Sequence, residues 1–355
     1  MRALVLLAFA WSLTLLAPGG GAARHHAAMA GEDVCWPSAR HGAAVAFDPV
    51  GRQLMLFGGV NHLPKPERRF ADTWALHAHG WKALDPGDRP AAGRLTPRIW
   101  AALAPDPTAP RMLLFGGLDT DGVRGDTWQW DGAHWSRLET RHRPPPRWHL
   151  AMAVDERRRQ LVLFGGVDST RGPLVHGDTW LWSGTDWVEA GGEGPSPRFG
   201  HAMAYDGERH AVVLVGGRDA AQRPLDDAWA WGGKRWARIE AGPGPCARLL
   251  HGLAFDPVRR TVLLFGGWDT RPSPEGFLAD LWELDGATWR RLEVAGPLGR
   301  RAHAMASDPV RRRVLLYGGY TSSEVLDDLW QWDGITWVPG RRSGQARRWP
   351  PGPGA

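Results

Sequence analysis

Apolar and polar positions along this chain alternate in a pattern that recurs six times. In the fourth copy, residues 198–205 alternate small side chains (Gly200, Ala202 and Ala204) with large ones, which is the period of a β-strand. A turn follows, and then an uninterrupted apolar run, as in residues 262–265 of the fifth copy. Because that run has no polar face, it predicts a central strand that is covered on both sides.

Fixed spacings mark each copy. An arginine opens it, an aspartate follows eight residues later in a turn, and a Gly-Gly pair begins ten residues after that aspartate. Asp-x-Trp comes next, with a second tryptophan seven residues after the first. The opening arginines are Arg40, Arg98, Arg147, Arg198, Arg248 and Arg300. The first glycines of the pairs are Gly58, Gly116, Gly165, Gly216, Gly266 and Gly318. The Asp-x-Trp aspartates are Asp72, Asp126, Asp178, Asp227, Asp280 and Asp328.

The second half of each copy predicts two further strands. Asp-x-Trp begins the third, and turns such as Asp131-Gly132 favour a tight hairpin into the segment that carries the second tryptophan. A unit of about 50 residues with four strands, repeated six times, is typical of propeller blades. We therefore predict an all-β fold, a six-bladed β-propeller with four antiparallel strands per blade. Each blade is complete within its own repeat, so exchange of strands between the termini is not required, although residues 34–36 or the C-terminal segment could add a strand.

The two ends of the chain differ from the repeats. Arg2 followed by an apolar stretch, residues 3–17, and a Gly/Ala-rich segment resembles a secretory signal. We expect a signal peptide and N-terminal segment over residues 1–30, the propeller over 31–338, and a flexible Arg/Pro/Gly-rich tail over 339–355. No other stretch is apolar enough to cross a bilayer. The chain is therefore expected to be secreted or periplasmic.

Composition adds two points. The chain of 355 residues has 22 tryptophans and three tyrosines, and the repeat positions account for twelve of the tryptophans, which predicts that most of them pack between blades. The two cysteines, Cys35 and Cys246, precede the opening arginines of repeats one and five. A disulfide between them is one interpretation in an exported protein, and free or intermolecular thiols are the other.

These motifs together resemble the kelch repeat. The resemblance rests on the Pro-Arg opening (Pro146-Arg147), the Gly-Gly pair and the spaced tryptophans, and it covers about residues 38–338. The third strand carries tryptophan where many kelch units carry tyrosine, which is similar to exported bacterial members. The resemblance implies a ligand site on the rim formed by the loops after the Gly-Gly pairs and the loops between blades.

The opening arginines are the first candidates for that site. Placed on one rim, six guanidinium groups would attract carboxylate, sulfate or phosphate. The alternative is that each arginine pairs with a neighbouring repeat aspartate and holds the blades together. The opposite rim carries further arginines in the Asp-Pro turns, and with a net charge of +5 this favours an anionic partner, or only solvated turn charges.

Residues that break the sixfold pattern are the second candidates. Trp100, Trp148 and His149 stand beside opening arginines, and Trp268 directly follows a glycine pair. A cluster of tryptophan, histidine and arginine suits a sugar or an aromatic group, whereas the alternative is extra packing under loops. Three histidines share one register three residues after their opening arginines, and we interpret them as core residues rather than metal ligands: His201, His251 and His303.

The sequence indicates the function less directly than it indicates the fold. We expect a non-catalytic binding or scaffold propeller that recognises a protein or glycan partner, including an anionic one, through this rim. The alternative is a sugar-modifying enzyme such as a sialic-acid-type mutarotase, which would need an acidic residue or histidine beside an arginine at the channel mouth. We expect no catalytic residues, no cofactor, no metal, no nucleic acid partner and a monomer.

Overall fold

The structure is a computed structural model that describes residues 36–63, 65–77, 80–87, 93–169, 174–271 and 276–340. These residues form six sheets of four antiparallel strands, which confirms the predicted propeller, and two additional short strand pairs. No helix occurs in the described ranges, so none there could span a membrane. The predicted signal peptide (1–30), Cys35 and residues 341–355 lie outside the described residues.

Each sheet is one blade, and its strands follow in chain order from the inner to the outer edge. The inner strands are β1 (Ala44–Asp48), β7 (Ala102–Pro105), β11 (Ala151–Asp155), β16 (Ala202–Asp206), β21 (Gly252–Asp256) and β25 (Ala304–Asp308). The second strands are β2 (Gln53–Phe57), β8 (Met112–Phe115), β12 (Gln160–Phe164), β17 (Ala211–Val215), β22 (Thr261–Phe265) and β26 (Arg313–Tyr317). The third strands are β5 (Thr73–His77), β9 (Thr127–Trp130), β13 (Thr179–Trp182), β19 (Ala228–Trp231), β23 (Leu281–Asp285) and β27 (Leu329–Trp332). The outer strands are β6 (Gly80–Asp85), β10 (Trp135–Leu138), β14 (Trp187–Ala190), β20 (Trp236–Arg238), β24 (Thr288–Leu292) and β28 (Trp337–Pro339).

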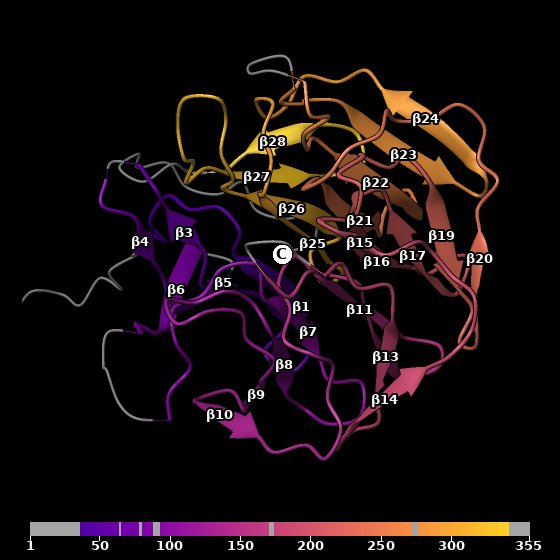
Figure 1. Ribbon diagram of the computed structural model, residues 1–355. Helices are drawn as coiled ribbons and strands as arrows, with labels where there is room; N and C mark the ends of the chain where they lie inside the picture. Colours follow the sequence, from indigo (N-terminus) through magenta and orange to yellow (C-terminus); the bar gives the residue numbers. More distant parts are fainter. Residues whose placement is uncertain are drawn as a thin grey trace, which may run out of the picture. The chain divides into compact units, whose positions relative to one another are not determined.

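The inner strands close a ring. Each contacts the inner strand of the next blade, and β25 of the sixth blade contacts β1 of the first. Figure 1 shows β1, β7, β11, β16, β21 and β25 near the centre and β10, β14, β20 and β24 at the periphery. Since every blade takes all four of its strands from one repeat, the ring closes without strand exchange among the described residues.

The second tryptophan of each repeat packs between blades, as the sequence predicts. Trp135 of the second blade meets the ring of Phe57 in the first blade with centroids 5.5 Å apart, and Trp187 meets Phe115 in the same way. The Trp187 indole also donates a hydrogen bond of 2.9 Å to Thr127 Oγ1 of the preceding blade. In five of the six blades an aromatic residue before the glycine pair contacts the tryptophan of the following blade in this way, and in the fourth blade the position is Val215.

Backbone hydrogen bonds repeat at every blade boundary. Gly59 N donates to Arg98 O of the next blade at 3.0 Å, and the corresponding bonds occur at the other boundaries. At the boundary between the sixth blade and the first, Gly319 N donates to Arg40 O at 2.9 Å. The Trp36 indole adds a bond of 2.8 Å to Asp327 O in the sixth blade. The chain therefore closes the ring with the same contacts that join successive blades.

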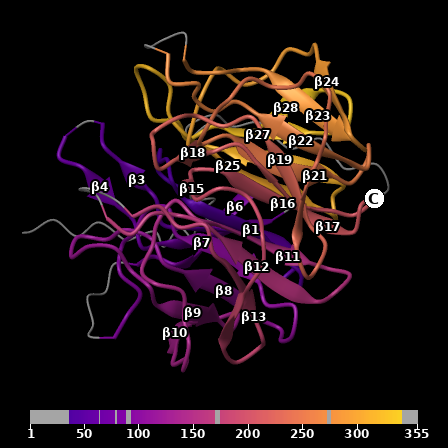
Figure 2. The ribbon, with the colours of Figure 1, turned by 45° about the vertical axis from the view of Figure 1, so that its right-hand side comes forward.

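The strand predicted over residues 198–205 is interrupted, which corrects the sequence-based expectation. Arg198–Phe199 forms a short strand, β15, which pairs with β18 (Arg218–Asp219), and β16 begins only at Ala202. The break lies at Gly200, which has a φ of 64°. In the oblique view of Figure 2, the pair β15–β18 and the other short pair, β3 (Val60–Asn61) with β4 (Arg68–Arg69), lie on the same side of the six sheets. This side is the rim on which the candidate site is built.

Candidate functional site

The rim is built from two short segments per blade. The residue after each opening arginine pairs with the residue after each glycine pair, as in the bridge Leu249↔Trp268. The residues after the arginines are His41, Ile99, Trp148, Phe199, Leu249 and Arg301. The residues after the glycine pairs are Val60, Leu118, Val167, Arg218, Trp268 and Tyr320. Identical backbone pairing thus presents different side chains at each blade.

The six opening arginines lie beneath this rim, each at most 2% exposed. Arg198 shows the pattern: its Nη1 and Nη2 donate to the two carboxylate oxygens of Asp227 at 2.5 and 2.9 Å. The same guanidinium donates to Gly216 O and Ser196 O, both at 3.0 Å. The other five arginines each make the same pair of contacts with the Asp-x-Trp aspartate of their own repeat.

These ion pairs bear on the predicted anion site. Burial acts to raise the pKa of Asp227, but the hydrogen bonds and charge of Arg198 outweigh it and lower that pKa. Trp229 donates a further bond to the same carboxylate at 2.8 Å. Since the guanidinium donors are already directed at protein acceptors, the geometry favours the architectural alternative for the opening arginines. We therefore build the candidate site from other residues.

A ring of left-handed residues surrounds the channel mouth. The second residue after each opening arginine has a φ between 50° and 64°, and the amide of Trp100 donates to Gly42 O of the preceding blade at 2.9 Å. Such φ values are unusual for side chains as large as those of Trp100 and His149. The six residues are Gly42, Trp100, His149, Gly200, Leu250 and Ala302. This backbone turns the side chains of Trp100 and His149 towards the mouth, where both line a hollow of about 150 Å³.

Three of the predicted binding residues meet here. The ring centroids of Trp100 and His149 are 4.1 Å apart, and those of Trp148 and His149 are 4.5 Å apart. Trp100 and Trp148 are 5.1 Å apart. All three are partly exposed. The structure therefore brings together the residues that break the sixfold pattern in the second and third blades.

The fourth predicted residue, Trp268, belongs to a second cluster around Arg301. The Arg301 guanidinium carbon lies 4.2 Å from the Trp268 ring centroid, 4.7 Å from that of Tyr320 and 5.1 Å from that of Phe277. These four residues and His62 line a hollow of about 380 Å³. In the described part of the chain, Arg301 has no ion pair with a carboxylate. Three aromatic faces and a hydrogen bond with the Tyr320 hydroxyl surround its positive charge.

His41 joins the two clusters. Its ring centroid is 4.7 Å from that of Tyr320 and 5.7 Å from that of Trp100, and its Nε2 lies 2.8 Å from His62 Nδ1. We refer to the connected set as the aromatic band. It consists of Trp148, His149, Trp100, His41, Tyr320, Arg301 and Trp268.

The imidazoles of the aromatic band are uncharged near neutral pH. Burial, with the nearby charges of His62 and Arg301, lowers the pKa of His41 to about 3. Burial also lowers the pKa of His149 to about 3, with smaller effects of His41 and Arg301. Burial raises the pKa of Tyr320. Arg301 is therefore the charged group of the band, within a largely aromatic surface.

Neither a metal centre nor an acid–base pair is evident at the mouth. The described residues contain no group of three or more histidine, cysteine or acidic side chains placed to hold a metal ion. His201, His251 and His303 are 6–8% exposed and pack against the glycine pairs of the preceding blades. No carboxylate is among the described residues that line the hollow at the mouth. Four histidines do line it, His149, His201, His251 and His303, but the arginine that the mutarotase alternative requires is not among its described lining residues.

The remaining predicted features lie away from the aromatic band. On the opposite rim, several turn arginines pair with acids, such as Arg209 with Asp206 at 2.9 Å and Arg158 with Asp155 at 2.8 Å. These pairs reduce the net charge that this rim presents. Cys246 is an exposed free thiol.

Comparisons with known proteins agree with this geometry. Residues 174–338 match a family described as the KLHDC2/KLHL20/DRC7 Kelch-repeats domain. The comparisons support the kelch family for this chain. The matched residues begin before the third strand of the third blade and extend into the last strand of the sixth, and the first two blades repeat the same spacings.

Curated relatives align over part of their length. The chain is 30% identical over 210 residues to a human protein named Rab9 effector protein with kelch motifs, covering 54% of this chain and 52% of that protein. It is 30% identical over 199 residues to the rat protein of the same name, with 51% and 49% covered. It is 31% identical over 147 residues to the flagellar outer arm dynein alpha chain of Chlamydomonas reinhardtii, with 36% and 3% covered. The chain thus spans about half the length of the Rab9 effector proteins and a small part of the dynein chain.

Proposed function

We propose that this kelch propeller is a protein-binding scaffold and that the aromatic band is its recognition surface. The observation that carries the proposal is Arg301, which lies among three aromatic rings with no carboxylate partner in the described ranges. Tryptophan, tyrosine and arginine dominate the binding energy of protein interfaces, because they offer large contact areas and directed hydrogen bonds. The band concentrates these residue types on one rim.

Its chemistry favours binding over catalysis. The band offers ring faces, neutral imidazoles and one guanidinium, whereas proton transfer needs an acid and a base poised near the working pH. The pKa of about 3 for His41 and for His149 keeps both imidazoles in the neutral form at neutral pH, so neither is an imidazolium that could act as a general acid. A partner that places an acidic group opposite Arg301 would supply the counter-charge that the chain itself does not provide.

The relatives support the scaffold class without defining the partner. The human and rat relatives are effectors by name, so their kelch motifs occur in proteins that act through other proteins. The apolar N-terminal stretch, and the tryptophan that this chain shares with exported bacterial kelch proteins, lead us to propose that it meets its partner outside the cytoplasm.

The test is a quantitative pull-down combined with a glycan array. Purified protein is used as bait against secreted and envelope proteins of the source cells, with Arg301→Gln, Trp268→Ala and, as a control on the opposite rim, Arg312→Gln. We expect the parent and the control to retain the same partner in similar amounts. Both rim variants should retain at least tenfold less of it. Circular dichroism checks that the variants fold.

Two results would overturn the proposal. Equal capture by all four proteins would show that the partner does not use the aromatic band. Binding to defined glycans that depends on Trp268, with no protein retained, would instead support a carbohydrate-binding propeller.

A further inference from the structure

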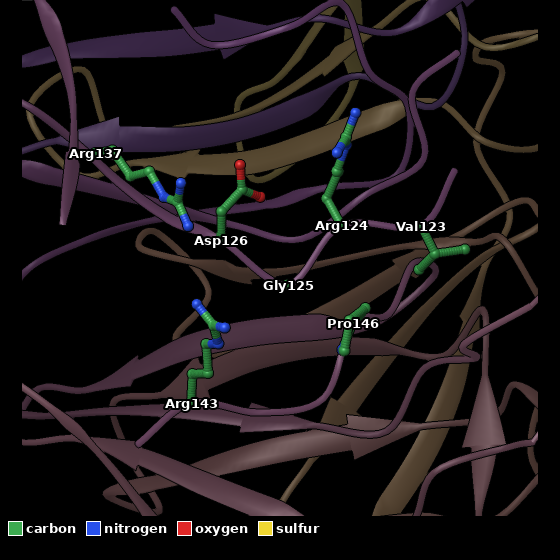
Figure 3. A pocket seen from close by; sticks show the side chains of 7 residues that line it. All are labelled: Val123, Arg124, Gly125, Asp126, Arg137, Arg143 and Pro146. Atoms are coloured by element: carbon green, nitrogen blue, oxygen red, sulfur yellow. The ribbon is translucent and has the colours of Figure 1, made fainter. Parts of the chain in front are cut away.

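A second surface feature lies between the second and third blades, apart from the aromatic band. A hollow of about 300 Å³ opens there beside the Arg98–Asp126 ion pair. Its walls come from the loop after the second glycine pair, from β10 and from the segment that leads into the third blade. The lining residues are Val123, Arg124, Gly125, Asp126, Arg137, Arg143 and Pro146, shown in Figure 3. We refer to this feature as the arginine hollow.

Two arginines face each other across the arginine hollow. In Figure 3 the side chains of Arg137 and Arg143 extend towards one another, and that of Arg124 points away. Arg124 is engaged by Asp121 at 2.7 Å and by Asp119. Like charges that converge in this way repel each other unless a counter-charge lies between them.

The protein provides little counter-charge for these two groups. Arg143 is exposed and has no ion pair among the described residues. Arg137 is 48% exposed, and among the described residues its ion-pair partner is Glu139 at 3.6 Å, which is itself 79% exposed. The carboxylate of Asp126 already accepts two bonds from Arg98, at 2.7 and 3.2 Å, and one from the Trp128 indole at 2.6 Å. The guanidinium donors of Arg137 and Arg143 are therefore available to a ligand.

The fold does not require this arrangement, because the other blades lack it. The register of Arg143, four residues before the opening arginine, holds Trp36, Arg94, Gly194, Gly244 and Gly296 elsewhere. The register of Arg137, two residues after the second tryptophan, holds Ala83, Glu189, Arg238, Arg291 and Pro339 elsewhere. Arginines at both registers coincide only at this blade boundary. A feature that the repeat does not need is a candidate for a specific contact.

We propose that the arginine hollow binds a phosphoryl group. The planar guanidinium forms paired hydrogen bonds to the oxygens of a tetrahedral anion, and two such groups on opposite sides match a dianion. The charge of Arg124 adds to the positive potential in the arginine hollow. The ion pairs of Arg124 with Asp119 and Asp121 make this contribution smaller. The ligand is either free phosphate or a phosphate monoester on a larger molecule, since both offer the same dianionic face.

The test measures binding of inorganic phosphate and of O-phosphoserine by isothermal titration calorimetry at pH 7.5 and constant ionic strength. The proteins are the parent chain, Arg137→Gln, Arg143→Gln and Arg291→Gln. Arg291 is the matched control, because it occupies the register of Arg137 in the fifth blade. We expect saturable binding to the parent and to the control, and a dissociation constant about tenfold or more higher in each hollow variant, as expected when a charged hydrogen-bonding partner is lost.

Each outcome of these titrations either supports or contradicts the proposal. Binding of both compounds indicates a monoester site, and binding of inorganic phosphate alone indicates a site for the free anion. Equal affinities in all four proteins, or no saturable heat with the parent, would overturn it. Since Arg137 and Arg143 are exposed, unchanged melting temperatures without phosphate are expected and would separate loss of the site from loss of the fold.

Discussion

Lowering the pH should unfold this propeller through its buried histidines. His201, His251 and His303 immediately precede the inner strands of the fourth, fifth and sixth blades. Burial, together with Arg198 and His251, lowers the pKa of His201 to about 3, and burial with Arg248 lowers that of His251 to about 3. Burial with Arg300 also lowers the pKa of His303. Protonation of any of them in the folded state would place a charge in the core beside an arginine.

The direction and the size of this loss of stability follow from the number of protons that the folded and unfolded states bind. A histidine in the unfolded chain has a pKa of about 6.5, so between about pH 6.5 and 3 the unfolded state binds more protons and stability falls as the pH falls. At pH 5, about 1.5 units below the unfolded value, each such histidine costs about 2 kcal/mol at 1.36 kcal/mol per unit. His201 and His251 together therefore remove about 4 kcal/mol between pH 7 and pH 5, and His303 acts in the same direction. That loss is a large part of a typical folding free energy of about 5–15 kcal/mol.

Substituting one histidine separates its contribution to the pH dependence of stability from those of the other two. The third blade carries Leu150 at the same register, so His251→Leu places a side chain that this fold already accepts there. Urea unfolding followed by tryptophan fluorescence at pH 7 and pH 5 gives the free energy of unfolding at each pH. We expect the drop from pH 7 to pH 5 to be about 2 kcal/mol smaller in His251→Leu than in the parent. His134→Gln changes an exposed side chain and serves as the control.

Carboxylates also make stability depend on pH, so only the difference between variants tests the argument. If His251→Leu and the parent lose the same free energy between the two pH values, then the folded imidazole takes up its proton as readily as the unfolded one, and the reasoning fails. If His134→Gln reduces the drop as much as His251→Leu, then burial is not the cause.

Two further predictions concern the repeat itself. Asp227→Asn leaves Arg198 buried without its counter-charge. The free energy of unfolding measured by urea titration should therefore fall by about 3–5 kcal/mol. A loss below about 1 kcal/mol would show that the fold does not need this ion pair. Gly216→Ala combines a φ of 63° with a new Cβ 2.8 Å from Arg248 O, whereas Gly132→Ala has a φ of 103° and open space. The thermal midpoint should therefore fall further in Gly216→Ala than in Gly132→Ala, and equal shifts would contradict the close approach.

The fold was predictable because the repeat signals the same architecture in several ways. Strand alternation, the Gly-Gly pair and the second tryptophan each mark the same unit, and the six copies keep one spacing. The break within the inner strand was not predictable. Small and large side chains alternate across it, and the left-handed residue is a tryptophan, histidine or leucine in half of the blades, namely Trp100, His149 and Leu250. Only the backbone contacts between blades impose that conformation.

The candidate site was predictable in part. Departures from the sixfold pattern identified Trp100, Trp148, His149 and Trp268, which the structure places in the aromatic band. Arg301 was missed because the chain has 43 lysines and arginines, and one more cation after an opening arginine did not stand out. An alignment of the six copies would have found it, since the described residues at its register are otherwise aromatic or aliphatic.

The aromatic band exists only in the closed ring. His41 comes from the segment that opens the first blade, and its ring lies 4.7 Å from that of Tyr320 in the sixth blade, so the band crosses the boundary where the two ends of the chain meet. A partner bound across this boundary would interact with the closed form and not with the unfolded chain. At a concentration 100 times its dissociation constant it would add about 2.7 kcal/mol of stability. That amount would offset more than half of the acid-induced loss assigned to His201 and His251, so recognition by the band and resistance to low pH should rise together.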